Sequence, residues 1–190
     1  VFMQWGIGHL FPAITMAAHV TASPNHQTGR SAPLKFRFDV AMSGRLGFEL
    51  QPCDMTEEDM AFSKRALTEY KRIRPVVQFG DLYRLSSPYE SRVAALMYVH
   101  EKRAVVFAWL MDKWLADSPP PLRLKGLKPE ARYMLLELNM DENGSVTNVH
   151  ERVLGGDFLM DAGIRIRWKK AFQSVCLEVA ETNPDAPASS

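Results

Sequence analysis

Cysteine is scarce in this chain, which limits both its chemistry and its location. Only Cys53 and Cys176 occur among the 190 residues, far apart in the sequence. Two distant thiols make neither a disulfide framework nor a metal-ligand spacing. Free thiols are ordinary in a reducing compartment, so the cytoplasm is favoured, although the localisation of the protein stays unknown.

Charge of one sign and long apolar runs are lacking as well. The chain has 23 Lys and Arg against 22 Asp and Glu, a net charge of +1 at pH 7. Such a balance gives no strong field toward nucleic acid or an acidic membrane surface. No apolar run reaches the roughly 18 residues of a membrane span. We therefore expect no nucleic-acid partner and no membrane partner.

A targeting sequence is also missing from the N-terminal residues. Val1 comes first, and no basic segment, apolar segment or cleavage site follows it. We expect a chain truncated on its N-terminal side, so export of the parent protein stays open.

A hydrophobic content of 46% and a charged content of 24% are typical of a globular protein with one domain or two small ones.

Strand and helix patterns alternate over the first 75 residues. We predict strands at 14–22 and 46–50 and helices at 32–42 and 56–74. The near-continuous apolar run of the first strand is typical of a parallel strand buried on both faces. Thr56 is a suitable N-cap for the long helix, and Pro75 is expected to end it. This order is typical of the last two units of a longer parallel α/β array.

After Pro75 the pattern changes to short β-rich runs separated by turn clusters. We predict strands at 76–79, 82–85, 94–99, 104–110, 132–138, 146–149, 164–168 and 172–179. Closely spaced strands of this kind indicate an antiparallel β-sandwich. We expect residues 76–182 to form a compact domain with its own core, with the boundary near 75–80. The polar, proline-containing residues 183–190 are expected to be a disordered tail.

Four collinear segments carry a resemblance to a known family. They are residues 18–30 (AHVTASPNHQTGR), 39–50 (DVAMSGRLGFEL), 73–85 (IRPVVQFGDLYRL) and 122–127 (LRLKGL). From about Trp5 to Cys176 the chain resembles α-galactosidases of glycoside hydrolase family 36. The order of the segments is that of the family, which makes the signal more specific than one short motif.

The resemblance implies a fold and an activity. The fold is a (β/α)8 TIM barrel, whose C-terminal portion residues 1–75 would supply, followed by an antiparallel β-sandwich over residues 76–182. The activity is that of a retaining α-galactosidase, which hydrolyses terminal α-galactosides of the melibiose or raffinose type. No organic cofactor and no metal are expected. A homo-oligomer of the full-length enzyme stays open.

The catalytic patterns of the family are missing from this chain. Similar enzymes carry a nucleophile in a Lys-Trp-Asp-x-Asn-Arg pattern and an acid/base in a Ser-Asp-x-x-Asp pattern, both upstream of the segment at 18–30. Neither occurs here, and Asp112-Lys113-Trp114 has the wrong residue order. A pair formed by Asp39 and Glu49 is a poor substitute, because Asp39 falls in a predicted helix and barrel helices lie outside the barrel. We therefore expect no catalytic residue in this chain, and a C-terminal fragment that is inactive alone.

His19 and Asn25 are the candidate substrate-binding residues. They follow the apolar part of the first strand, and ligands bind at the carboxyl ends of strands in parallel α/β folds. Imidazole and amide groups suit sugar hydroxyls. The alternative is that Asn25 only satisfies backbone groups of its loop, because Asn and Pro are ordinary turn residues.

Two alternative interpretations stay open at this point. One is a non-catalytic carbohydrate-binding or structural β domain, for which Tyr98, Phe107, Trp109 and Trp114 would form a sugar-stacking face, although core packing fits them better. The other is a different activity of the same family, either α-N-acetylgalactosaminidase or galactosyl transfer.

A metal site is not expected, since His100-Glu101 and His150-Glu151 lack the second histidine of a zinc-protease helix.

Overall fold

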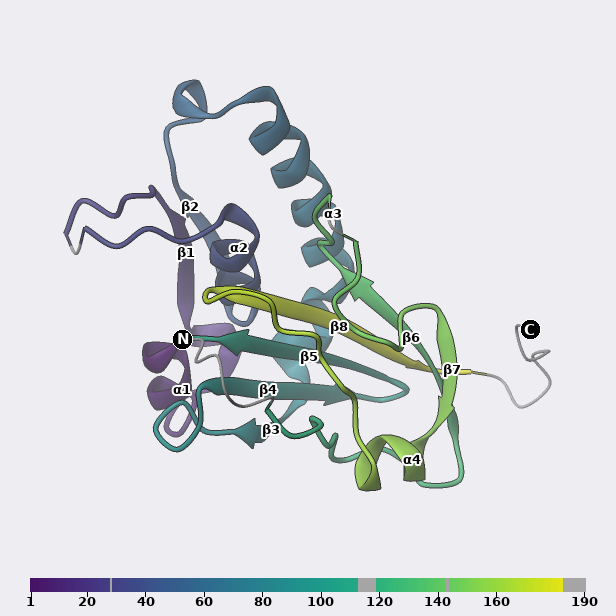
Figure 1. Ribbon diagram of the computed structural model, residues 1–190. Helices are drawn as coiled ribbons and strands as arrows, with labels where there is room; N and C mark the ends of the chain where they lie inside the picture. The colour runs from purple at the N-terminus through teal and green to yellow at the C-terminus, as the bar shows by residue number, and fades with distance from the viewer. Residues whose placement is uncertain (28, 113–118, 143, 183–190) are drawn as a thin grey trace.

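The computed structural model describes residues 1–27, 29–112, 119–142 and 144–182. A six-stranded antiparallel sheet lies at the centre of the molecule. The N-terminal α/β unit covers one face of this sheet, and the long connections and a short helix cover the other (Figure 1). Within the described residues, no helix combines the length and the apolar character that a membrane span needs.

The N-terminal unit has the predicted alternation of strands and helices. Its elements are α1 (Phe2–Ile7), η1 (Ala13–Thr15), β1 (Ala17–Thr21), α2 (Leu34–Met42), β2 (Arg45–Glu49), η2 (Pro52–Asp54) and α3 (Glu57–Phe79). Strands β1 and β2 pair in parallel, with His19 opposite Gly47. Each of these strands is followed by a helix, so the predicted β-α-β-α order is confirmed.

Helix α3 begins as predicted but ends later. Thr56 caps it, because its hydroxyl oxygen accepts a hydrogen bond from the Asp59 backbone N–H at 3.1 Å. The helix then continues through Pro75 to Phe79, so both the predicted end at Pro75 and the predicted strand at 76–79 are wrong. Val76 and Val77 are buried in the core. Their burial offsets the backbone hydrogen bond that the proline cannot donate.

The six-stranded sheet contains most of the predicted strands. Its members are β3 (Asp81–Ser86), β4 (Val93–His100), β5 (Arg103–Leu110), β6 (Arg132–Leu138), β7 (Arg152–Gly155) and β8 (Gln173–Glu181). They lie in the order β3-β4-β5-β8-β6-β7, and every neighbouring pair is antiparallel. The prediction of an antiparallel β domain after the long helix is thereby confirmed.

The segments 146–149 and 164–168 are not strands of this sheet. They form only isolated bridges, between Thr147 and Ile166 and between Leu122 and Ile164. The buried carboxylate of Glu137 accepts hydrogen bonds from the Val146 and Thr147 backbone N–H groups, so a side chain takes donors that a strand partner would use. Helix α4 (Gly156–Asp161) and β7 lie between these segments, and the sequence pattern did not predict them.

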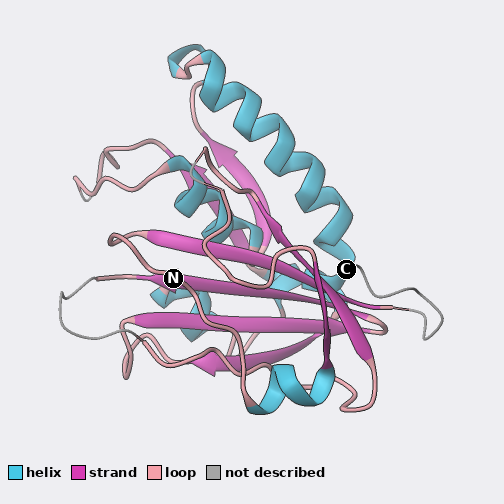
Figure 2. Cartoon of the chain, turned by 45° about the vertical axis from the view of Figure 1, so that its right-hand side comes forward, coloured by secondary structure: helices cyan, strands magenta, loops and turns pink. Residues whose placement is uncertain are grey.

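Alternate residues of the central strands point into two separate cores. In β5, Val105, Phe107 and Trp109 face the core shared with α2 and α3. Their neighbours Ala104, Val106 and Ala108 face a second core, which α4 and the connections around residues 122–166 complete. Figure 2 shows the long helix α3 on one side of the sheet and the short α4 on the other. The β domain thus has a core of its own, formed by residues between 83 and 179, while its other sheet face shares a core with the N-terminal unit.

A buried carboxylate also joins the N-terminal unit to the sheet. Glu178 on β8 accepts hydrogen bonds from Arg72 on α3 and from Arg103 on β5. Burial lowers the pKa of the Arg72 guanidinium, but hydrogen bonds and ion pairs with Glu178 and Glu69 outweigh it, so the pKa is raised overall. Because a buried charge is stable only when paired, this contact fixes where α3 lies on the sheet.

Candidate functional site

One face of the β1–β2 pair is apolar and covered by helices. Ala18 and Val20 are buried in the core that includes α2 and α3. Phe48 on β2 lies on the same side and makes an edge-to-face contact with Phe38 of α2, at a centroid distance of 5.3 Å. This packing fixes which way every residue of the two strands points, since side chains alternate along a strand.

The opposite face of the pair is polar and exposed. His19 on β1 and Arg45 and Glu49 on β2 point away from the helices. The exposure of β1 alternates along the strand, so the prediction that this strand is buried on both faces is wrong for the described chain. Parallel sheets normally have both faces covered, so an open polar face on a parallel pair is unusual.

His19 and Glu49 meet on this open face. The His19 Nδ1 atom lies 3.3 Å from Glu49 Oε1, and the side chains are 42% and 57% exposed. The imidazole leans over Gly47, where a Cβ atom would come within 2.3 Å of the His19 ring. Glycine is therefore required at position 47 for this ring position. The carboxylate orients the imidazole, which leaves the Nε2 edge for another group.

Asn25 lies in the loop that leaves β1 and leads to α2. Its backbone N–H donates to the Arg30 carbonyl at 2.9 Å, and its own carbonyl accepts from the Gly29 N–H at 2.8 Å. The Asn25 Oδ1 atom accepts from the Gln27 N–H at 3.1 Å, the arrangement of an Asx turn. The side-chain oxygen thus shapes the loop, which extends from the end of β1 (Figure 1).

Asp39 has a structural place that is separate from the open face. It is fully buried on α2, and its carboxylate accepts from Lys35 Nζ at 2.6 Å, Asn139 Nδ2 at 2.8 Å and Ser174 Oγ at 2.7 Å. These bonds tie α2 to β8 and to the end of β6. Glu49 instead points to solvent, so the structure does not set the two acids up as a glycosidase pair.

The aromatic candidates of the β domain are core residues. Tyr98, Phe107 and Trp109 are all buried, and the Phe107 and Trp109 rings stack with centroids 5.9 Å apart. Tyr98 donates a hydrogen bond to the Ser43 carbonyl at 2.8 Å, and burial raises the pKa of its phenol well above the ordinary value. Core packing of these three is thereby confirmed, while Trp114 lies outside the described residues.

The histidines do not gather into a metal site. His150 Nδ1 accepts a hydrogen bond from the Glu137 backbone N–H at 3.0 Å, which uses one of its two possible ligand atoms. Across the part of the chain that the structure describes, no three His, Cys, Asp or Glu side chains lie close enough to hold a metal ion.

Comparison with known proteins matches both halves of the chain. Residues 1–80 match the family model described as Melibiase, and residues 93–179 match the glycosyl hydrolase family 36 C-terminal domain. Alpha-galactosidase AgaA from Geobacillus stearothermophilus is 38% identical over 172 residues, which are 89% of this chain and 22% of that protein. Alpha-galactosidase Mel36A from Lactobacillus acidophilus is 36% identical over 85% of this chain and 20% of its own length.

Solved structures agree with the sequence matches. The crystal structure of AgaA superposes with a TM-score of 0.83 at 36% identity and covers 95% of this chain and 24% of that chain. The alpha-galactosidase from Lactobacillus brevis gives a TM-score of 0.81 at 28% identity over 99% of this chain and 25% of that chain. This chain thus spans about a quarter or less of the relatives that it matches. With both family models and the superposed structures in agreement, the chain belongs to glycoside hydrolase family 36 and corresponds to its C-terminal part.

Proposed function

We propose that this chain is the C-terminal part of a retaining α-galactosidase that hydrolyses terminal α-galactosides of the melibiose or raffinose type. The chain matches proteins named α-galactosidases along nearly its whole length. Variants of AgaA have been solved in complex with raffinose and with stachyose, which supports this substrate class. The full-length enzyme is proposed to act as a homo-oligomer on these galactosides.

The observation that carries the proposal is the open polar face of the β1–β2 pair. In a (β/α)8 barrel the helices lie outside and the other faces of the strands enclose the interior. Here α2 and α3 cover one face, and His19 and Glu49 occupy the other. We therefore assign β1, α2, β2 and α3 to the last units of such a barrel, with His19 directed toward its interior.

The proposed domain boundary lies at Gly80, between α3 and β3. This position is within the predicted window of 75–80, with the barrel portion before it and an antiparallel β-sandwich domain after it, up to residue 182. The six-stranded sheet would form one layer of the sandwich. The second layer would be the bridged segments on its α4 side.

The proposed reaction is a double displacement. One aspartate attacks the anomeric carbon, and a second acts first as acid and then as base. Both are assigned to the part of the enzyme that precedes this chain. His19 and Asn25 would bind substrate hydroxyls, with the His19 ring oriented by Glu49 and the Asn25 Nδ2 group acting as donor.

The test uses the protein encoded by the whole reading frame that contains this chain. The sequence upstream of Val1 should contain both aspartate patterns. In that protein, His19→Ala is expected to lower kcat/KM for raffinose about tenfold, a loss of about 1.4 kcal/mol of transition-state binding. Asn25→Asp keeps the turn acceptor but removes the amide donor, and it is also expected to lower kcat/KM for raffinose.

Gln27→Ala, in the same loop, serves as the control and should leave kcat/KM unchanged. Unaltered kinetics in both His19→Ala and Asn25→Asp would refute the assignment of these residues. An upstream sequence without either aspartate pattern would refute the proposed function itself.

A further inference from the structure

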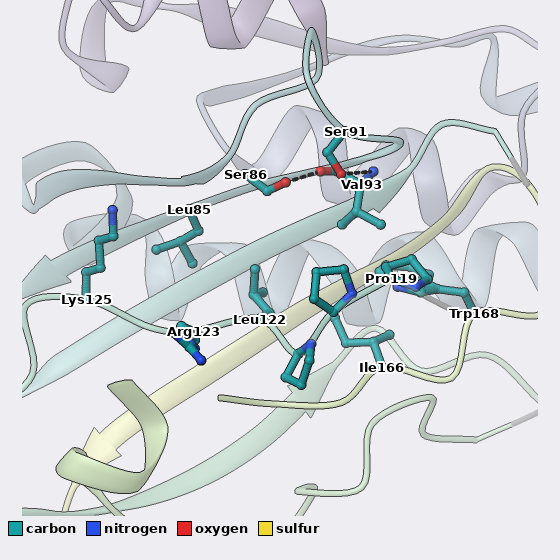
Figure 3. A pocket seen from close by; sticks show the side chains of 12 residues that line it. Leu85, Ser86, Ser91, Val93, Pro119, Leu122, Arg123, Lys125, Ile166 and Trp168 are labelled. Atoms are coloured by element: carbon teal, nitrogen blue, oxygen red, sulfur yellow. Dashed lines mark hydrogen bonds between the residues drawn. The ribbon is translucent and has the colours of Figure 1, made fainter. Parts of the chain in front are cut away.

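A pocket opens on the α4 side of the six-stranded sheet, at the turn that joins β3 to β4. Its volume is about 420 Å³, within the range of pockets that hold small molecules. The lining comes from three segments that are distant in the sequence: residues 85–93, residues 119–125 and residues 166–168 (Figure 3). The floor belongs to the second core, because Val93 is one of its buried members.

An irregularity of β3 places two consecutive side chains on the pocket. The register with β4 shifts between Arg84 and Ser86, so the strand bulges at Leu85. Consecutive residues of a regular strand point to opposite faces, but here Leu85 and Ser86 both line the pocket. Bulges commonly re-aim a side chain in this way beside functional sites.

The walls are held in place without a ligand. The Ser86 hydroxyl donates to the Val93 carbonyl, and the Ser91 hydroxyl oxygen accepts from the Val93 N–H at 3.2 Å. On the other side, Leu122 and Ile164 exchange two backbone hydrogen bonds of 2.8 and 2.9 Å. A preformed pocket loses little conformational entropy when a ligand binds.

The chemistry of the lining combines an aromatic ring with hydrogen-bonding groups. Trp168 is half-buried and lies with Pro119 at one end of the pocket (Figure 3). Arg123 and Lys125 are exposed, and among the described residues neither has an ion-pair partner. None of the described lining residues is Asp or Glu. The pocket therefore offers an apolar surface, hydroxyl oxygens and several N–H donors.

We propose that this pocket binds one ring of a neutral oligosaccharide. A pyranose has an apolar C–H face, which packs on an indole, and a rim of hydroxyls, which accept from guanidinium and ammonium groups and donate to serine oxygens. The largely apolar lining favours a neutral ring over a free anion, because an anion would have to give up its water against proline and tryptophan. This site does not depend on the proposed hydrolysis.

The experiment is a titration of the isotopically labelled 190-residue chain with raffinose, followed by NMR. We expect saturable shifts at the Trp168 indole N–H and at backbone amides of residues 85–93 and 122–125. Trp168→Ala should weaken binding at least about tenfold, while Trp168→Phe should weaken it less, because a ring remains. Arg123→Met should weaken binding, and Arg165→Met, an exposed arginine outside the pocket, should not.

Circular dichroism melting checks that each variant folds. If Trp168→Ala is unfolded, Trp168→Phe and Arg123→Met still decide the result. Saturable shifts that Arg123→Met and Trp168→Phe leave unchanged would overturn the site, as would the absence of shifts around the pocket. Tighter binding of galacturonate than of raffinose would overturn the assignment to a neutral sugar.

Discussion

The two sheets of this chain differ in how many of their faces are covered. The six-stranded sheet has a packed core on each side, and its central strands β4, β5 and β8 are almost entirely buried. The parallel pair of β1 and β2 has one packed face and one exposed polar face. A two-stranded sheet rarely has independent stability, so this unit depends on α2, α3 and the larger sheet for its position.

The six-stranded sheet therefore has a structural role, whereas the open face of the β1–β2 pair carries polar groups suited to binding a ligand. Most side chains of the central strands β4, β5 and β8 are apolar or take part in buried networks, such as the one around Glu178. The exposed face of the small sheet holds an oriented imidazole next to a carboxylate. Polar groups on an open strand face that the packing does not require are good candidates for binding.

The largest expected effect is the loss of an aromatic ring from the shared core. Phe107→Ala is expected to lower the free energy of unfolding by about 4 kcal/mol, because the ring is fully buried beneath α3. Phe48→Ala, on a strand of the small sheet and 40% exposed, should cost only about 1 kcal/mol. Urea denaturation measures both. Equal losses would remove the distinction between the two sheets.

The next effect concerns two carboxylates with opposite surroundings. Asp39→Ala is expected to cost about 3 kcal/mol, because it leaves the Lys35 ammonium group without its buried partner. Glu49→Gln removes one side of an exposed pair and should cost less than about 1 kcal/mol. Urea denaturation at neutral pH compares them. If Glu49→Gln were the more damaging change, the polar face would have a structural role.

The smallest effect appears only at alkaline pH. Burial raises the pKa of Tyr98 in the folded state, whereas unfolding returns it to about 10. The unfolded state therefore loses this proton first, and stability falls as the pH rises above about 10. Tyr98→Phe should lower the free energy of unfolding by about 1 kcal/mol at neutral pH, because the hydrogen bond to Ser43 is lost. The variant should also lose less stability at alkaline pH than the unaltered chain.

The matched control for this change is Tyr89→Phe, since Tyr89 is exposed. Urea denaturation over a series of alkaline pH values follows both variants. If the free energy of unfolding falls equally with rising pH in Tyr98→Phe and in the unaltered chain, the buried phenol does not contribute to the loss of stability at alkaline pH.

Much of the fold could be predicted where local signals and packing agree. The Thr56 cap and the apolar runs of β4, β5 and β8 specify their elements without help from distant residues. The helix end predicted at Pro75 was wrong, because the packing of Val76 and Val77 outweighs the local helix-ending signal of the proline. The strand predicted at 146–149 was wrong, because the carboxylate of Glu137, which lies outside this segment, accepts hydrogen bonds from its backbone.

The candidate site was predictable only in part. His19 could be singled out from its place at the end of an apolar strand, but its orientation by Glu49 depends on the parallel pairing of two strands. The pocket beside Trp168 could not be predicted, because its three segments come together only through the sheet and the Leu122–Ile164 bridge. Trp168 lies in an apolar and basic alternation that the sequence pattern assigns to a strand.

A hydrolysis assay of the purified 190-residue chain with p-nitrophenyl α-galactoside tests most directly whether the chain lacks the catalytic residues of the family. We expect no turnover above background, because the chain contains neither of the two catalytic aspartate patterns of the family. Turnover that Asp39→Asn or Glu49→Gln abolishes would contradict this expectation, since the chain would then contain its own catalytic carboxylate.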